Sequence, residues 1–439
     1  MNSKTLTFYV FLLCSVLSTT LQAEESSSLN NLSSAERLSS MTEPEGNLTL
    51  SQAIALTLAH NPKLAAFSEE IRVREATKLQ SGLLPNPEFS ASASNFGNSK
   101  FQGFDGDAVT LQLSQLIELG GKRAARVQAA ELDQQLANWE YESQRIAVLS
   151  AMAQAYINVI SAQQNLKLQQ ELLKLTDNVT HIASLQVRAG NVAPIEEVRA
   201  KVSRTSSRID LLRAKRDLKT ARKQLVTFWG GEQAKFKQAL GKLDNIQTPP
   251  ALSELLAKLD NNPELKRWLT EIEKRKALVE LEQANAIPDI TVSIGGNNYI
   301  NNDDYNLNAG ISIPIPVFNR NQGNIDRSQR QLVKANDEHR QAINNIQLAL
   351  NTAFQNIETA WMEITALQKE ALPGAESAFK ATQRGYQLGE FDFLNVLDAQ
   401  RTLFRIKQQY IQALTDYQIN RIKIEQLIGN IFKTDESKP

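Results

Sequence analysis

The sequence predicts a mainly α-helical fold with a small β part, in which long antiparallel coiled-coil helices are joined to strands of a transmembrane β-barrel. Three observations lead to this prediction. Some helical segments are far too long for a compact domain, the few strand segments alternate between apolar and polar residues, and the two halves of the chain follow one plan. Lys plus Arg and Asp plus Glu both total 48, so the bulk charge gives no reason to expect nucleic acid as a partner.

The N-terminus has the pattern of an exported protein. Residues 1–23 carry a basic Lys4, an apolar run and a small residue, Ala23, at their end, which predicts a secretory signal peptide. Cys14 leaves a lipoprotein anchor as an alternative, although the leucine before it is bulkier than such processing prefers. Without the signal peptide the chain contains no cysteine, so we expect neither disulfides nor thiolate chemistry. A polar tail, residues 24–47, follows.

Beyond the signal peptide there is no run of 18 apolar residues. A membrane-spanning helix needs about 20 predominantly apolar residues, so we expect any membrane crossing to be made by strands. The choice is therefore between a soluble exported protein and an outer-membrane barrel.

The sequence repeats landmarks at an offset near 200 residues. The repeated landmarks are Asn61-Pro62-Lys63-Leu64 with Asn262-Pro263-Glu264-Leu265, Pro85 with Pro288, Ser114 with Ser312, Gly190 with Gly389, and Trp229-Gly230 with Ile428-Gly429. We interpret them as two structural copies, residues 48–230 and 251–429, with a linker at 231–250 and a polar tail at 430–439.

Each copy is expected to contain a short helix, a helix of about 20 residues that begins at the Asn-Pro turn, two strands and two very long helices. The 68 residues between Gly121 and Gly190 include no glycine or proline. As one helix they would be about 100 Å long at 1.5 Å per residue. Such a helix cannot be the core of a compact domain.

The apolar residues of this segment recur at three- and four-residue steps, which is typical of a coiled-coil seam that needs partner helices. The stripe comprises Leu132, Leu136, Trp139, Ile146, Leu149, Ala153, Tyr156 and Ile160. Three other segments free of glycine and proline are the expected partners: Ile195–Trp229, Asn324–Leu372 and Phe391–Ile428.

Four segments alternate with period two and predict strands near 88–96, 108–118, 289–296 and 305–317. One face is apolar, and the other carries hydroxyls and amides with almost no charge, which is typical of a membrane β-barrel. The connecting loops are rich in Asn, Asp and Gly. Pro314 and Pro316 lack amide hydrogens, so we expect them at the end of the last strand.

Four strands cannot close a barrel, and an open edge within lipid would leave unpaired backbone groups that cost several kcal/mol each. Three copies of the chain would together supply twelve strands and pair every edge. A soluble four-stranded sheet packed on helices is the alternative, which the shortage of an apolar partner surface disfavours.

Four segments together resemble one known family. They are LIELGGKRAARVQAA at 116–130, IPIPVFNRNQGNI at 313–325, VRAGNVAPIEEV at 187–198 and RGYQLGEFDFLNVLDAQ at 384–400. With the duplicated plan, the chain from Leu48 to about Gly429 resembles the TolC-type outer-membrane factors. Within that family, ELGGKR and PVFNRNQG are most similar to the outer-membrane channel subunit of cobalt-zinc-cadmium efflux pumps.

This resemblance implies a homotrimer with a twelve-stranded barrel in outer-membrane lipid and a helical barrel in the periplasm. Such a protein is a passive exit duct, here for heavy-metal cations. Its implied partners are a periplasmic adaptor (membrane fusion) protein and an inner-membrane transporter of the resistance-nodulation-division type. A TolC-like duct for drugs or secreted proteins is the nearest alternative, and a soluble periplasmic coiled-coil scaffold is a more distant one.

The resemblance also implies a docking site at two helix-turn-helix tips, since glycine turns interrupt the long helices there. The matching positions are Val187, Arg188, Ala189, Gly190, Asn191, Arg384, Gln387, Leu388, Gly389 and Glu390. The alternative is that these are only hairpin turns. Related channels carry a ring of acidic side chains near the tip, but here Lys380 and Gln383 occupy the expected stretch, so no gate residues are assigned.

No residues indicate an enzyme. The three histidines, His60, His181 and His339, have no neighbours at metal-ligand spacing, so we expect no metal site. The Gly120-Gly121-Lys122 triplet lacks the spacing of a phosphate loop and is better interpreted as a bend between strand and helix. We expect no catalytic residues and no cofactor.

Overall fold

The structure is a computed structural model that describes residues 42–94, 108–299 and 304–429. The predicted signal peptide, most of the N-terminal tail and the C-terminal tail lie outside the described residues. In chain order the elements are β1 (Asn47–Leu48), α3 (Leu50–His60), α4 (Pro62–Ser81), β2 (Glu88–Ser94), β3 (Ala108–Ile117), α5 (Lys122–Arg188), α6 (Pro194–Val226), η1 (Thr227–Trp229), β4 (Gln238–Ala239), α7 (Leu252–Leu256), η2 (Leu259–Asn261), α8 (Pro263–Asn285), β5 (Ile290–Tyr299), β6 (Asp304–Ser312), α9 (Gln322–Ala366), η3 (Leu367–Ala371), α10 (Leu372–Leu388) and α11 (Phe393–Leu427).

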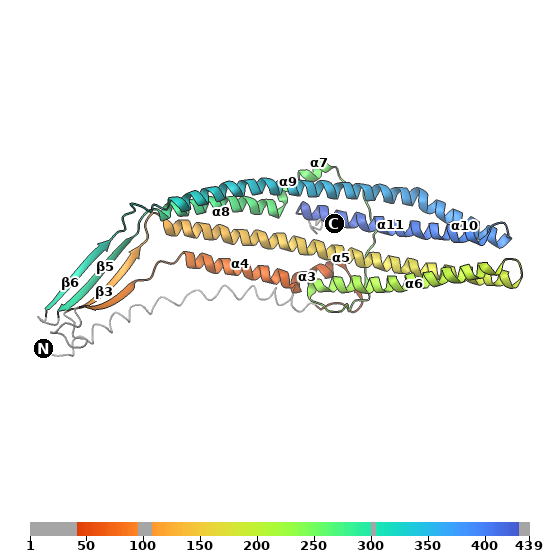
Figure 1. Cartoon of the computed structure of the whole chain (residues 1–439), viewed down its shortest axis with the longest axis horizontal. Helices are drawn as coiled ribbons and strands as arrows, with labels where there is room; N and C mark the ends of the chain where they lie inside the picture. Colours follow the sequence, from red (N-terminus) through yellow and green to blue (C-terminus); the bar gives the residue numbers. More distant parts are fainter. Residues whose placement is uncertain (1–41, 95–107, 300–303, 430–439) are drawn as a thin grey trace, which may run out of the picture.

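The chain is strongly elongated, with the main sheet at one end and the helices running along the long axis (Figure 1). The hairpin turns between α5 and α6 and between α10 and α11 both lie at the end far from the sheet. The fold is therefore mainly helical with few strands, as the sequence predicted.

The main sheet has the order β2-β3-β5-β6, and every neighbouring pair in it is antiparallel. The register places Thr110 opposite both Ser92 and Asn297, and Asn297 opposite Asn306. These polar side chains bond to one another across strands. The Thr110 hydroxyl donates to Asn297 Oδ1 over 2.7 Å, and Asn297 Nδ2 donates to Asn306 Oδ1 over 2.9 Å. One face of the sheet is thus a ladder of hydroxyls and amides, with carboxylates only at Glu88 and Asp304, at the ends of their strands.

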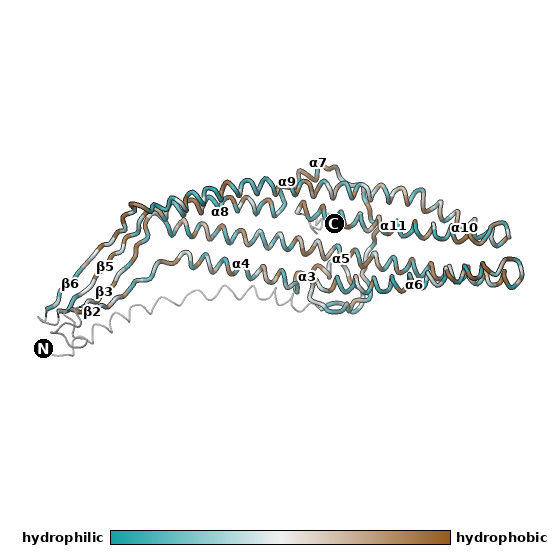
Figure 2. Tube along the Cα trace, viewed as in Figure 1, coloured by the Kyte–Doolittle hydropathy of each residue, from teal (hydrophilic) through white to brown (hydrophobic). Residues whose placement is uncertain are grey.

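The opposite face is apolar and uncovered in the single chain. Leu307 is 89% exposed, Ile311 is 72% exposed and Phe89 is 67% exposed. A continuous apolar face of this kind marks a surface that contacts lipid or protein. Figure 2 shows the same alternation of hydrophilic and hydrophobic residues in the strands, and a longer period along the helices.

Two strands differ from their expected bounds. β5 continues past the Gly295-Gly296 pair to Tyr299, and its last residues pair with β6, although this stretch was expected to be a loop. Asn297 extends the ladder because its amide side chain lies on the polar face, opposite Thr110 and Asn306. β6 ends at Ser312, five residues earlier than the apolar alternation suggested, because Pro314 cannot donate to a neighbouring strand.

The long helix predicted between Gly121 and Gly190 is present as α5, with 67 residues. It packs against α4, α6, α8 and α11. Among the described residues, α5 is the one helix that by length and composition could cross a membrane, and 44% of its most apolar window is buried inside the chain.

The main hydrophobic core lies at mid-length, where α5 meets α3, α6, α9 and α11 and the short β1–β4 pair. Tyr156 is buried at its centre and bonds through its hydroxyl to the Leu48 carbonyl at 2.7 Å and the Leu240 carbonyl at 2.6 Å. Burial raises the pKa of Tyr156 to about 12. The Tyr156 side chain therefore connects Leu240 in the linker segment, and Leu48 in β1, to α5.

The first long helix of the C-terminal half, which begins with α9, does not stop at Pro373-Gly374, contrary to the end expected near Leu372. A π-helical segment, η3, precedes Pro373, and the chain continues as α10 to Leu388. A proline removes one backbone donor, and a π turn realigns the carbonyls so that the helix continues. The corresponding helix of the first half, α5, has no such interruption.

The two halves use the same cap at the start of their 20-residue helices. Asn61 accepts hydrogen bonds from the amides of the next turn and donates through Nδ2 to the Phe228 carbonyl over 2.8 Å. Asn262 does the same for α8 and donates to the Leu427 carbonyl over 2.7 Å. Each asparagine therefore caps one helix at its N-terminus and another at its C-terminus.

We expect Asn61→Ala and Asn262→Ala each to lower the free energy of unfolding by about 2 kcal/mol, since each loses an N-cap worth about 1 kcal/mol and a hydrogen bond of similar size. Chemical denaturation of the detergent-solubilised protein measures the effect. Asn336→Ala, on the exposed surface of α9, is the control and should change stability by less than about 0.5 kcal/mol. Unequal losses at the two caps would contradict their equivalence.

Candidate functional site

The ten predicted docking residues lie in the two hairpin turns at the end of the molecule far from the sheet (Figure 1). Nine of the ten side chains or backbones are exposed, and Val187 is half-buried. The geometry of each turn follows from a glycine in the left-handed region.

The first turn joins α5 to α6 through Gly190, which has φ 75°. The amide of Gly190 donates to the Val187 carbonyl, and the amide of Asn191 donates to the Gln186 carbonyl, each over 3.0 Å. These two bonds form a Schellman motif, which closes the end of α5. Asn191 Nδ2 also donates to Gln186 Oε1 over 2.8 Å.

The second turn joins α10 to α11 and repeats this pattern at an offset of about 199 residues. Gly389 has φ 79°. Its amide donates to the Tyr386 carbonyl over 3.2 Å, and the amide of Glu390 donates to the Gly385 carbonyl over 2.8 Å. The two tips therefore present the same backbone shape with different side chains.

Gly385 is a position important for packing at the second tip that the sequence prediction omitted. A Cβ atom added to it would lie 2.2 Å from Cδ2 of Phe391, so the aromatic ring packs directly on the glycine backbone. Phe391 remains 45% exposed on its outer side. The glycine within RGYQ was the available signal, because an isolated glycine in a helix indicates close approach of another group.

The two hairpins pack on each other through a second hydrophobic core. Its members come from both hairpins and comprise Val179, Ala183, Ala200, Ala375, Phe379, Tyr386, Phe393, Val396, Leu397 and Leu403. The rings of Tyr386 and Phe393 are 5.6 Å apart at 56°. The Tyr386 hydroxyl donates to Glu196 Oε2 on α6 over 3.4 Å, which is a long bond between the hairpins. The tips are thus one unit.

Exposed apolar side chains surround the tips. They are Leu185, Ile195, Val198, Val202, Leu388, Phe391 and Leu394. Patches that combine such side chains with arginines are typical of protein interfaces. Arg188 and Arg384 supply the positive charge at the two tips, and both are exposed.

Glu197 and Glu376 near the tips form ion pairs, whereas Glu390 and Asp392 form none within the described part of the chain. Lys201 donates to Glu197 over 2.8 Å and holds the pKa of that carboxyl below its usual range, together with Ser184. Glu376, the nearest acid upstream of the second tip, pairs with Lys407 at 3.4 Å. Lys380, in the stretch of the second hairpin where the family resemblance led us to look for acidic side chains, is exposed.

Residues 42–94, 108–299 and 304–429 contain no group of three or more His, Cys, Asp or Glu side chains that could hold a metal ion. Gly120 and Gly121 form the bend between β3 and α5, with φ 68° and 72°. Next to this bend, Lys122 Nζ contacts Asp289 Oδ1 at 2.6 Å. The bend predicted from the Gly-Gly-Lys triplet is present, and the ion pair was not predicted.

The packing of the two hairpins at the tip should become less stable above pH 10. Burial, and then the nearby Glu196 carboxylate, raise the pKa of Tyr386 from 10.0 to about 12. The neutral phenol is favoured in the folded chain, so its contribution is complete below pH 10 and is lost as the pH rises towards 12. The difference between the pKa of 10.0 in the unfolded chain and about 12 in the folded chain corresponds to about 2–3 kcal/mol of stability.

Absorbance of the phenolate at 295 nm should show one tyrosine fewer titrating near pH 12 in Tyr386→Phe. The stability difference between pH 9 and pH 11 should also shrink in this variant. Tyr156, whose pKa is also about 12, stays in place as the internal reference. An unchanged high-pH titration in Tyr386→Phe would contradict the assignment.

Comparison with known proteins identifies related sequences over most of the chain. A family model described as outer membrane efflux protein matches residues 53–231 and 256–430. The cobalt-zinc-cadmium resistance protein CzcC of Cupriavidus metallidurans is 33% identical over 389 residues, which are 88% of this chain and 91% of CzcC. The outer membrane protein TolC of Escherichia coli is 24% identical, covering 90% of this chain and 85% of TolC.

Solved structures share the fold. A crystal structure of CusC superposes with a TM-score of 0.75 at 20% identity, covering 86% of this chain and 91% of CusC. The outer membrane protein VceC of Vibrio cholerae gives a TM-score of 0.71 at 17% identity, covering 87% of this chain and 96% of VceC. At these identities the superpositions establish the fold alone.

Proposed function

Because the chain belongs to the outer membrane efflux protein family, we propose that it is the outer-membrane channel of a tripartite heavy-metal efflux system. The observation that carries this proposal is the 33% identity to the cobalt-zinc-cadmium resistance protein across 88% of the chain. The sheet end lies in the outer membrane and the helices extend into the periplasm. The protein acts as a passive exit duct, and a metal cation is its cargo.

The two free edges of the sheet, β2 and β6, support a homotrimer. Neighbouring strands alternate in direction, so β6 of one copy and β2 of the next run antiparallel and can pair. Three copies close a ring of twelve strands without an edge exposed to lipid. The apolar face then contacts lipid, and the hydroxyl and amide face lines the lumen.

The absence of cysteine after residue 14 allows a direct test of this pairing. One cysteine introduced in β2 and one in β6 should form a disulfide only between copies. Non-reducing gels should then show trimers that resist denaturant. Cross-links confined to single chains would contradict the closed ring.

The two tips are the proposed docking site for a periplasmic adaptor, which couples the duct to an inner-membrane transporter. Exposed backbone at Gly190 and Gly389, apolar side chains around them, and Arg188 and Arg384 support this assignment. Apolar contacts supply affinity in such interfaces, and charges select the partner.

Reversal of charge at both tips tests the docking proposal. We expect Arg188→Glu with Arg384→Glu to lower metal tolerance at least about tenfold, since like charges across an interface cost several kcal/mol. The matched control reverses Arg330 and Arg340, which are 80% and 76% exposed on α9, far from the tips. Full tolerance in the tip variant would contradict docking there.

The substrate is tested in a strain that lacks this gene. Tolerance to zinc, cadmium, cobalt, nickel, copper and silver is measured beside tolerance to detergents and dyes, with and without the restored gene. We expect the gene to restore tolerance to metals. If the gene restores tolerance to detergents and dyes alone, the proposal that metals are the substrate is wrong, and a duct for drugs is the alternative.

A further inference from the structure

A concentration of positive charge lies at mid-length and has no role in the proposed duct or its tips. Residues 213–242 contain nine Lys or Arg and two Asp or Glu, although the whole chain is neutral. Within this stretch the end of α6 and the segment that follows it enclose a groove of about 800 Å³. That volume falls within the range of ligand-binding sites.

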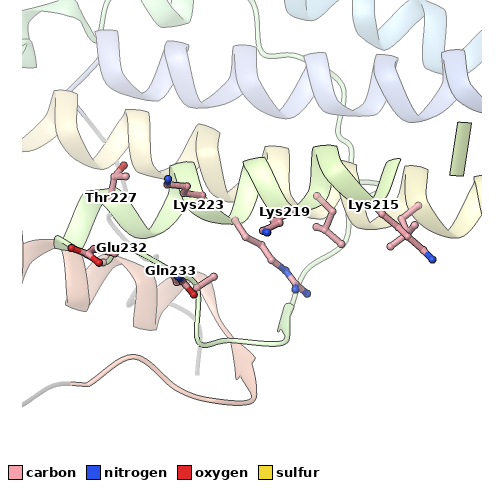
Figure 3. Close-up of a pocket in the computed structure, with 11 residues that line it drawn as sticks. Lys215, Lys219, Lys223, Thr227, Glu232 and Gln233 are labelled. Carbon is pink, nitrogen blue, oxygen red and sulfur yellow. The ribbon is translucent and has the colours of Figure 1, made fainter. Parts of the chain in front are cut away.

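The wall formed by α6 carries three lysines in a row. Lys215, Lys219 and Lys223 follow each other at four-residue steps along the exposed face of the helix (Figure 3). Like charges at this spacing destabilise a helix. No ion pair with any of the three occurs among the described residues. Glu232 is the single carboxylate that lines the groove.

Arg222 adds a fourth cation and is held in place by the protein. Its guanidinium donates to the Lys237 carbonyl and lies 5.6 Å from the centre of the Phe236 ring. Its Nε is buried and has no hydrogen-bond partner within the described part of the chain. Burial lowers the pKa of Arg222. Arg222 is thus a cation fixed at the wall of the groove.

The corresponding face of the second half is built differently. The equivalent positions in α11, 199 residues later, are Leu414, Gln418, Arg421 and Ile422. Leu414, Gln418 and Ile422 are buried, whereas the three lysines of α6 are exposed. An exposed row of lysines on this face is therefore particular to the first half.

The spacing of the lysines selects the ligand. Four-residue steps along a helix place them about 6 Å apart, and alternate side chains on one face of an extended peptide are about 6.8 Å apart. A lipid surface does not fit, because the C-terminal end of α6, which lines the groove, lies at mid-length, far from the sheet (Figure 1). We propose that this groove binds an extended acidic peptide segment of a periplasmic protein, with carboxylates on alternate residues.

The test uses the full-length protein in detergent and a fluorescently labelled peptide in which glutamate alternates with serine. Fluorescence anisotropy should show binding that weakens with added salt. We expect Lys215→Gln with Lys219→Gln and Lys223→Gln to lower the affinity at least about tenfold. Replacing the same three lysines with arginine should preserve binding.

Two controls distinguish binding at the groove from non-specific electrostatic binding to exposed lysines. Replacing Lys334, Lys369 and Lys380, which are also exposed, with glutamine should leave the affinity unchanged. A peptide of the same composition with its glutamates in one block should bind more weakly than the alternating one. Equal binding of both peptides would contradict the proposed match between lysine and carboxylate spacing. An equal loss of affinity in both lysine variants would contradict the placement of the binding site in the groove.

Inorganic phosphate provides the competing outcome. If phosphate binds in a lysine-dependent manner and the alternating peptide does not, the groove is a small-anion site and the proposal is wrong. Failure of the peptide to bind the unmodified protein also overturns it. The metal-tolerance assay of the lysine variant does not depend on peptide binding, so it tests the duct function separately.

Discussion

Replacing Asp289 with alanine should lower the free energy of unfolding by about 3 kcal/mol, because the substitution leaves a buried lysine without its ion-pair partner at the junction of sheet and helices. The Lys122 side chain is 9% exposed, and its Nζ contacts Asp289 Oδ1 at 2.6 Å. The same carboxylate accepts from the amide of Leu119 over 2.9 Å. Asp289 thus joins the start of β5 to the bend before α5. The measurement is denaturant unfolding of the detergent-solubilised protein.

Three further variants separate charge from hydrogen bonding. Asp289→Asn keeps an acceptor for Leu119 and should cost less than alanine. Lys122→Met with Asp289→Leu removes both charges and should recover most of the loss. Asp326→Ala breaks an exposed pair with Arg330 and should cost less than about 1 kcal/mol. Equal costs for the exposed and buried aspartates would contradict the importance of burial.

Gly385→Ala should destabilise the second tip by about 3 kcal/mol, at the upper end of what overpacking costs. The new Cβ would lie 2.2 Å from Phe391, and the amides of Glu390 and Phe391 both donate to the Gly385 carbonyl. Moving the ring therefore disturbs the bonds that close the turn. Hydrogen exchange at the α10–α11 turn should rise, and metal tolerance should fall with it.

The same substitution eleven residues earlier in the same helix is the matched control. Gly374, also in α10, has open space where a Cβ would lie. Gly374→Ala should stabilise the chain by about 0.5–1 kcal/mol, since alanine restricts the unfolded chain and favours helix. Phe391→Ala should partly rescue Gly385→Ala. A tip that tolerates Gly385→Ala without faster exchange would contradict the proposed packing.

The elements and their faces could be predicted from the sequence because each leaves a local periodic signal. Alternation of apolar and polar residues with period two indicates a strand whose two faces have different environments. Apolar residues at three- and four-residue steps indicate a helix with one apolar stripe. Gly190 and Gly389 mark turns because only glycine adopts their backbone conformation at little cost. The family resemblance was also available, since its motifs span the turns and bends.

The ends of elements were predicted less well. Apolar alternation continues beyond Ser312, but pairing stops where proline begins. Helix continues through Pro373 because a π turn compensates for the lost donor. In both cases the outcome depends on hydrogen-bond partners that a pattern of side chains does not report.

The sequence by itself determined the long helices, the alternating strands, the glycine turns, the duplicated plan and the family. Only the tertiary structure decided which distant groups meet. Tyr386 meets Glu196 and Lys122 meets Asp289 across more than 160 residues, and the basic groove needs α6 and the returning segment 231–234 side by side. Periodicity reports the environment of each residue, whereas a specific partner is set by how helices pack in register, which no local pattern encodes.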